Sequence, residues 1–156
     1  MTHSPRSMLV TGGAGFIGCN YLSIALEADS ELRVVNLDAL TYAGHPASQR
    51  RVAETFGERY ALIEGDIRDA EAVRRVFSEY TIDTVVHFAA ESHVDRSIDG
   101  PLDFIDTNIR GTANLLEAAR SDDPQAFGVA TQALQQVTPQ LQALMRDYGM
   151  AVCGAR

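Results

Sequence analysis

The stretch MLVTGGAGFIGCNY, residues 8–21, joins an apolar run to a cluster of glycines and then to a second apolar segment. The run predicts a short buried strand over 7–13, and residues 16–29 follow it with helical periodicity. The apolar positions in that predicted helix are Ile17, Tyr21, Leu22, Ile24 and Ala25. A strand, a glycine turn and a helix are therefore expected in direct succession.

The glycine cluster TGGAGFIG, residues 11–18, fits two spacings. Gly13, Gly15 and Gly18 read as GxGxxG, whereas Gly12, Gly15 and Gly18 read as GxxGxxG. Glycines allow a tight turn and a close backbone approach, and the helix N-terminus offers free N–H groups to a pyrophosphate. A plain turn is the alternative. The residues of this stretch expected to bind the dinucleotide are Gly12, Gly15, Phe16, Ile17 and Gly18.

An acidic residue closes the next apolar run, RVVNLD, twenty positions after Gly18. In dinucleotide-binding units a carboxylate at this place accepts the ribose hydroxyls. Asp38 would repel a 2′-phosphate and no arginine directly follows it, so the sequence favours NAD over NADP. A solvent-exposed aspartate at a structural turn is the alternative. Ala39, Leu40 and Thr41 are expected beside the same ribose.

Strand and helix patterns alternate through residue 120. Further strands are expected over 32–38, 60–66 and 83–90, and a short polar helix or loop over 45–57. Asp69 is the expected N-cap of a helix over 69–80 whose buried face carries Val73, Val76 and Phe77. A long helix over 101–120 has Pro101 in its first turn. This order predicts an α/β fold with a doubly wound parallel sheet, a Rossmann fold.

The chain changes character after Arg120. The predicted organisation is a Rossmann NAD-binding region at 1–120, a linker at 121–129, and a helical tail at 130–156 with a possible final strand. An apolar stripe predicts an amphipathic helix over 130–148, broken at Pro139. Residues 150–154 are expected to pair with the fourth strand and complete the order 3-2-1-4-5.

Composition excludes several classes of function. The 156 residues carry a formal charge of −8, and all thirteen basic residues are arginines without a basic run, which argues against nucleic-acid and anionic-membrane partners. No run reaches the ~18 apolar residues of a membrane span. Cys19 and Cys153 have no metal-ligand spacing, so a cytoplasmic protein with reduced thiols and no metal is expected.

A dense polar patch interrupts the stretch VVHFAAESHVDRSI, residues 85–98. The patch follows the fourth predicted strand directly. With it in place, the sequence resembles the extended short-chain dehydrogenase/reductase family, and within it the nucleotide-sugar 4,6-dehydratase branch. The resemblance covers residues 8–120 and is carried by MLVTGGAGFIGCNY, NLDALTYAG, GDIRD, VVHFAAESHVDRSI and FIDTNIRGTANLLEAAR.

The resemblance implies NAD as cofactor and a nucleotide sugar of the dTDP-glucose class as substrate. It implies that Ser92 touches both cofactor and sugar, and that Asp95 and Arg96 support the loop. For His93 and Asp95, a hydrogen-bonded pair that stabilises the loop is the alternative. The residues expected along the cofactor are Asp66 and Ile67 at the adenine, Phe88, Ala89, Ala90, Glu91 and Thr107, with Asn108 close by.

The catalytic groups of that family are missing from these 156 residues. Its reaction uses a tyrosine base activated by a lysine four positions on, and a Thr-Asp-Glu run. The sequence contains no lysine and no Thr-Asp-Glu run, so no residue is assigned a catalytic role. A shortened chain that lacks the substrate domain, binds NAD and does not turn over is expected. The alternatives are a non-enzymatic module that forms a homodimer through helices 101–120 and 130–148, another nucleotide-sugar epimerase or dehydratase, and a gene fragment.

Overall fold

Four parallel strands form the sheet of this protein, seen in a computed structural model that describes residues 4–42, 44–92 and 101–122. The strand order is β3-β2-β1-β4. The strands are β1 (Ser7–Thr11), β2 (Arg33–Asp38), β3 (Tyr60–Glu64) and β4 (Thr84–His87). Each lies inside a predicted stretch, so the parallel sheet is confirmed.

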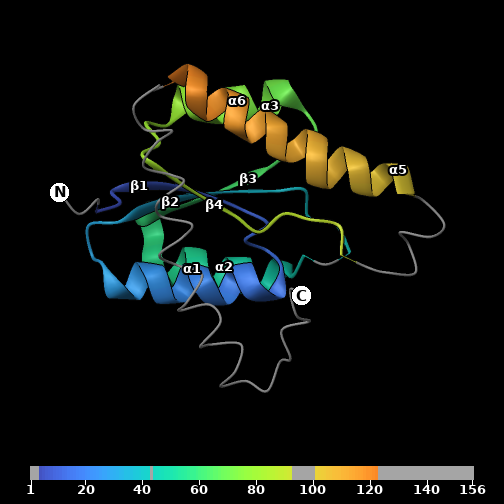
Figure 1. Cartoon of the computed structure of the whole chain (residues 1–156). Coiled ribbons are helices and arrows are strands. Elements are labelled where there is room, and N and C mark those ends of the chain that lie inside the picture. Colours follow the sequence, from blue (N-terminus) through green and yellow to red (C-terminus); the bar gives the residue numbers. More distant parts are fainter. Residues whose placement is uncertain (1–3, 43, 93–100, 123–156) are drawn as a thin grey trace, which may run out of the picture.

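Helices cover both faces of the sheet (Figure 1), with α1 and α2 on one face and α3 and α6 on the other. This arrangement confirms the doubly wound Rossmann fold. The helical elements are α1 (Phe16–Ala28), α2 (Pro46–Phe56), η1 (Gly57–Arg59), α3 (Ala70–Glu79), α5 (Pro101–Phe104), η2 (Ile105–Gly111) and α6 (Thr112–Asp122).

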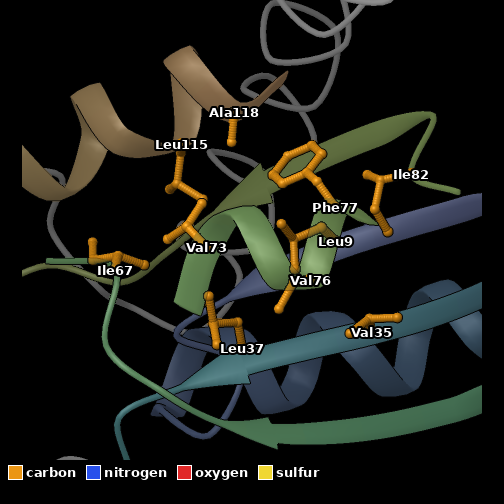
Figure 2. Close-up of a cluster of buried hydrophobic side chains, with 10 residues drawn as sticks. All are labelled: Leu9, Val35, Leu37, Ile67, Val73, Val76, Phe77, Ile82, Leu115 and Ala118. Carbon is orange, nitrogen blue, oxygen red and sulfur yellow. The ribbon is translucent and has the colours of Figure 1, made fainter. Parts of the chain in front are cut away.

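Alternation along β1 divides the core into two clusters. Met8 and Val10 face α1 and α2, whereas Leu9 faces α3 and α6, because successive side chains of a strand point to opposite faces. Figure 2 shows the second cluster, in which side chains of the sheet meet those of α3 and α6. Its members are Leu9, Val35, Leu37, Ile67, Val73, Val76, Phe77, Ile82, Leu115 and Ala118.

Helix α1 buries a narrower face than its apolar pattern suggests. Gly18, Leu22 and Leu26 are buried, because positions four apart lie along one side of a helix. Ile17 and Ile24 stay 38% and 49% exposed, and their spacing of seven places them together on another side. The apolar periodicity therefore located the helix correctly, and the structure shows that two of its isoleucines lie outside the buried face.

Helix α3 forms as predicted. Helix α2 shows that the segment 45–57, predicted as a short polar helix or a loop, is a helix. The Asp69 carboxylate accepts hydrogen bonds from the N–H groups of Glu71 and Ala72, at 2.9 and 3.2 Å, as an N-cap does. The polar segment 45–57 is mainly helical, with Pro46 in its first turn. It buries Gln49 beside Val52, so a polar side chain enters the interior.

The long helix over 101–122 contains a π-helical stretch, η2, in its middle. Continuous α-helix was expected there. Gly111 ends η2 at a close approach to the loop after β3, because a Cβ at Gly111 would lie 2.5 Å from Cδ1 of Ile67. Helix α6 also continues to Asp122, two residues into the predicted linker.

Several predictions fall outside the described residues. These are the patch at 93–100, the linker beyond 122, the helix at 130–148 and the strand at 150–154. Within the described ranges, no helix is long and apolar enough to cross a membrane.

Candidate functional site

A pocket opens at the edge of the sheet where all four strands end. Loops after β1, β2, β3 and β4 contribute to its wall, as expected for a parallel α/β sheet. Its lining consists of Gly12, Gly15, Leu37, Asp38, Ala39, Thr41, Gly44, Gly65, Asp66, Ile67, Arg68, Phe88, Ala89, Ala90, Glu91 and Thr107. Most of the residues predicted from the sequence to face the dinucleotide are therefore brought together.

The glycine loop after β1 depends on two positions without a side chain. Gly12 has a φ of +70°, and a Cβ there would lie 2.5 Å from the main-chain nitrogen of Ala89. At Gly18 a Cβ would lie 2.3 Å from the carbonyl oxygen of Gly12. The loop can therefore turn sharply and rest directly on both β4 and α1 only because these residues are glycines.

The N-terminus of α1 keeps its hydrogen-bonding capacity. Gly15 is the N-cap residue, no side chain of the described residues caps the helix, and its first turn has no acidic residue. The free N–H groups and the positive end of the helix dipole suit an anionic group. Gly15 lines the pocket, so this helix end opens onto it.

Asp38 at the end of β2 faces the same pocket and is only 8% exposed. Oδ2 accepts a 2.7 Å hydrogen bond from the N–H of Ala14, and Oδ1 accepts one of 2.8 Å from Leu40. The carboxylate thus fixes two loops, and each oxygen keeps a further lone pair. The alternative of a solvent-exposed aspartate at a turn does not describe this side chain.

A buried amide network, which sequence reasoning missed, supports the glycine loop from below. Asn36 Oδ1 accepts from the N–H of Gly13 at 3.0 Å, and Gln49 Nε2 donates to the carbonyl of Gly13 at 2.8 Å. Asn36 Nδ2 also donates to Gln49 Oε1 and to the Tyr60 hydroxyl, both at 3.0 Å. The Tyr60 hydroxyl in turn donates to Gln49. Both polar groups of the Gly13 backbone are thereby held by side chains.

The loop after β3 presents an ion pair to the pocket. Arg68 donates from Nε to Asp66 Oδ2 at 2.8 Å, and its main-chain N–H donates to Oδ1 at 2.8 Å. Burial acts to raise the pKa of Asp66, but the hydrogen bonds and charge of Arg68 outweigh burial and hold that pKa below its usual value. Asn114 of α6 holds the loop by donating to the carbonyls of Ile67 and Arg68. Ile67 is buried beneath this helix as well as lining the pocket.

The loop after β4 is held by the π-helical stretch. Asn108 Oδ1 accepts from the N–H of Glu91 at 2.8 Å, and its Nδ2 donates to the carbonyl of Glu91 at 2.9 Å. This pair of bonds fixes the peptide groups on either side of one residue. The Tyr42 hydroxyl adds a longer bond of 3.3 Å to Glu91 Oε2.

A few predicted residues do not line the pocket. Phe16 and Ile17 form the exposed start of α1, and Gly18 is buried against Gly12. Leu40 has a φ of +48° and lies at the neighbouring surface of α2, while Ser92 is exposed at the end of its described segment. His93, Asp95 and Arg96 lie outside the described residues.

Residues 9–133 match the family described as GDP-mannose 4,6 dehydratase. The chain belongs to this family. Its glycine loop, Asp38 and the pocket between them fall inside the matched range. Among the described residues, no group of histidine, cysteine, aspartate and glutamate could hold a metal ion.

Relatives within this 4,6-dehydratase family are similar in sequence and in structure. The dTDP-glucose 4,6-dehydratase of Shigella flexneri is 53% identical over 114 residues, which cover 73% of this chain and 31% of that protein. The crystal structure of the dTDP-glucose 4,6-dehydratase DesIV from Streptomyces venezuelae, with NAD bound, is 44% identical with a TM-score of 0.66. That match covers 74% of this chain and 36% of DesIV.

An epimerase is also similar in structure. The UDP-glucose 4-epimerase of Bifidobacterium longum, in complex with NAD⁺ and UDP, is 34% identical with a TM-score of 0.64. The match covers 74% of this chain and 34% of that enzyme. This 4,6-dehydratase family chain spans about a third of the length of the curated relatives it matches.

Sequence reasoning missed four residues that line the pocket, namely Leu37, Gly44, Gly65 and Arg68. Each directly neighbours a predicted residue or lies in one of the motifs quoted above. Extending the predicted site to every residue in and beside those motifs would have included all four. It also gave no role to the residues that act from outside the pocket, such as Gln49 and Asn114. Their partners lie 36 and 47 positions away, and no local pattern marks such contacts.

Proposed function

We propose that this chain binds NAD in the pocket at the carboxyl edge of the sheet. One observation carries the proposal: the uncapped N-terminus of α1 and the Asp38 carboxylate open onto the same pocket. The first suits a pyrophosphate and the second suits ribose hydroxyls. Gly12 rests directly on Ala89, so a side chain at this position would clash with the main chain of Phe88 and Ala89 and would displace the two loops that form the pocket wall.

The substrate proposed for the complete protein is dTDP-glucose, and the proposed reaction is dehydration to the 4-keto-6-deoxy sugar. Sequence identity supports the dehydratase over the epimerase, because in structural matches that each cover 74% of this chain DesIV is 44% identical and the epimerase 34%. The described residues would contribute the cofactor-binding part. The 156 residues contain no lysine and no Thr-Asp-Glu run, so this chain alone is expected to form no product.

Calorimetric titration with NAD and, in parallel, with NADP tests the cofactor. Saturable binding that favours NAD is expected. Asp38→Ala should weaken NAD binding by about tenfold or more, since hydrogen bonds to a charged group contribute ~1.5–3 kcal/mol. Glu54→Ala, on the exposed surface of α2, is the matched control and should bind like the wild type. Equal affinity for NAD and NADP, or an unaffected Asp38→Ala variant, would refute the assignment.

A second proposal concerns association: the chain pairs with a second copy through the helix over 101–122. Four large apolar side chains of this helix are between 49% and 73% exposed, which supports a covered face. They are Leu102, Ile105, Ile109 and Leu116. Gly111, Leu115 and Ala118 are the buried residues of the same helix, so these four side chains lie outside its core-facing side.

Sedimentation velocity tests this pairing with two matched variants. The wild type should sediment as a dimer and Ile109→Glu as a monomer. Ile24→Glu removes an exposed isoleucine from α1, on the opposite face of the sheet, and should remain dimeric. A monomeric wild type would contradict the proposal.

A further inference from the structure

The imidazole of His87 joins three elements at the end of β4. Its Nδ1 lies 2.6 Å from the hydroxyl oxygen of Thr11, the last residue of β1. Its Nε2 lies 3.1 Å from the hydroxyl oxygen of Thr112, the first residue of α6. The polar atoms around the ring nitrogens are therefore two uncharged hydroxyls.

Thr11, His87 and Thr112 form a chain of hydrogen bonds, and the direction of each bond follows from the Thr112 end, at the start of α6. The hydroxyl oxygen of Thr112 lies 2.7 Å from the main-chain carbonyl oxygen of Asn108. A carbonyl can only accept, so the single hydroxyl hydrogen of Thr112 is donated to Asn108. The oxygen of Thr112 must then accept from His87, which places the imidazole proton on Nε2.

The other end of this chain of hydrogen bonds, at Thr11 of β1, is consistent with this tautomer. A neutral imidazole with its proton on Nε2 has a free lone pair on Nδ1, which accepts from the hydroxyl of Thr11. The oxygen of Thr11 in turn accepts from the N–H of Ala89 at 3.4 Å. Thr11 is completely buried, so a second proton on His87 would leave its hydroxyl hydrogen without this acceptor.

Both ends of the hydrogen-bonded chain return to the wall of the pocket. One end is the N–H of Ala89, and the other is Asn108, whose side chain holds both main-chain groups of Glu91. Ala89 and Glu91 line the pocket. This chain of hydrogen bonds therefore fixes one loop at two points from a single half-buried ring.

We infer that His87, as its neutral Nε2–H tautomer, is a positioning residue that holds the loop 89–91 in place against the dinucleotide. The inference rests on the proposed binding of NAD. Burial lowers the pKa of His87 below its usual value, so the neutral form that the geometry requires predominates at neutral pH.

Nitrogen-15 spectra of the imidazole in the protein without cofactor test the tautomer. At pH 7.5 one protonated and one unprotonated nitrogen are expected for His87, with the proton on Nε2. His45 is exposed and provides the reference ring in the same spectrum. A proton on Nδ1, or an imidazolium signal, would overturn the inference whether or not NAD binds.

Titration with NAD tests the positioning role. Thr112→Val removes the acceptor for Nε2–H, and an affinity about tenfold weaker is expected from the loss of a half-buried hydrogen bond that holds the loop. Thr112→Ser keeps the hydroxyl and should stay within about twofold of the wild type. Affinity for AMP, which offers no group to the loop 89–91, should be equal in both variants.

The outcomes separate the two proposals. If the wild type does not bind NAD, the proposed function fails and the spectrum alone decides the tautomer. If the wild type binds and the valine and serine variants bind equally well, His87 has no positioning role. Equal losses of NAD and AMP affinity would also overturn the inference, because they would indicate general damage to the fold.

Discussion

Two polar networks support the two sides of the pocket, one buried and one half-buried, and they use different chemistry. Under the glycine loop, the amides of Asn36 and Gln49 hold the backbone of Gly13, with the Tyr60 phenol as their neighbour. After β4, an imidazole between two hydroxyls holds the loop. Amides do not titrate, but a phenol loses its proton in alkali and an imidazole gains one in acid. One pocket can therefore have two walls whose support weakens at opposite ends of the pH range.

The largest expected effect comes from breaking the amide network at its centre. Gln49→Leu leaves the carbonyl of Gly13 without its donor and the hydroxyl hydrogen of Tyr60 without its acceptor. A loss of about 3 kcal/mol in the free energy of unfolding is expected, from ~1–3 kcal/mol for each orphaned group. Urea denaturation measures it, with Glu54→Leu on the exposed surface of the same helix as control. A Gln49→Leu variant as stable as the control would show that the network contributes nothing.

The next effect should appear in acid and only in the network after β4. Because the folded pKa of His87 is depressed, its contribution is complete above the unfolded pKa of ~6.5 and is lost as pH falls toward the folded pKa. Unfolding free energies measured from pH 7.5 to 5 should therefore fall more steeply for the wild type than for His87→Gln. If the unfolding free energies of the wild type and His87→Gln fell in parallel with pH, His87 would make no pH-dependent contribution to stability.

The opposite end of the pH range should probe the glycine-loop network. Burial is the main cause that raises the pKa of Tyr60, to about 12. Its contribution is complete below the unfolded value of ~10 and is lost as pH rises through the folded value. Tyr60→Phe should cost about 1 kcal/mol at pH 7, since Asn36 and Gln49 still bond to each other, and should remove the alkaline loss. If the free energy of unfolding of this variant still fell at alkaline pH as in the wild type, groups other than Tyr60 would be responsible for that fall.

The smallest effect is expected at the surface of the loop after β4. Tyr42 is 52% exposed and reaches Glu91 through a bond of 3.3 Å. Tyr42→Phe should change the free energy of unfolding by less than about 0.5 kcal/mol. Asn108→Ala removes both main-chain bonds of Glu91 and provides the contrasting variant in the same assay. A larger loss of unfolding free energy in Tyr42→Phe than in Asn108→Ala would show that the surface bond of Tyr42, and not Asn108, is the main support of this loop.

The fold followed from local signals in the sequence. Apolar runs that alternate with helical segments located every strand of the described sheet. Asp69 could be predicted as the N-cap of α3 because capping involves only neighbouring residues. The same holds for the pocket positions in and beside the motifs. Gly12 and Asp38 were expected there because strand ends and turns carry recognisable residues.

The support of the site could not be predicted in the same way. Gln49 lies in a polar segment and would ordinarily face water, yet β2 and β3 supply partners that bury it. His87 was visible as the end of an apolar run, but its partners Thr11 and Thr112 lie 76 and 25 positions away. Only the register of parallel strands and the π-helical stretch bring these groups together, and neither is written in the local periodicity.

The π-helical stretch also determines which changes of chain length the helix over 101–122 can accept. A π-helical turn holds one residue more than the α-helical turn that it replaces, so the segments on either side keep nearly the orientation of a regular α-helix. Deleting one residue from 105–107, ahead of Asn108, should therefore restore regular α-helix with little rotation of its two ends. The same deletion in the regular α-helix α6 should rotate everything beyond it by about 100° and shift it by ~1.5 Å, and should be far more damaging.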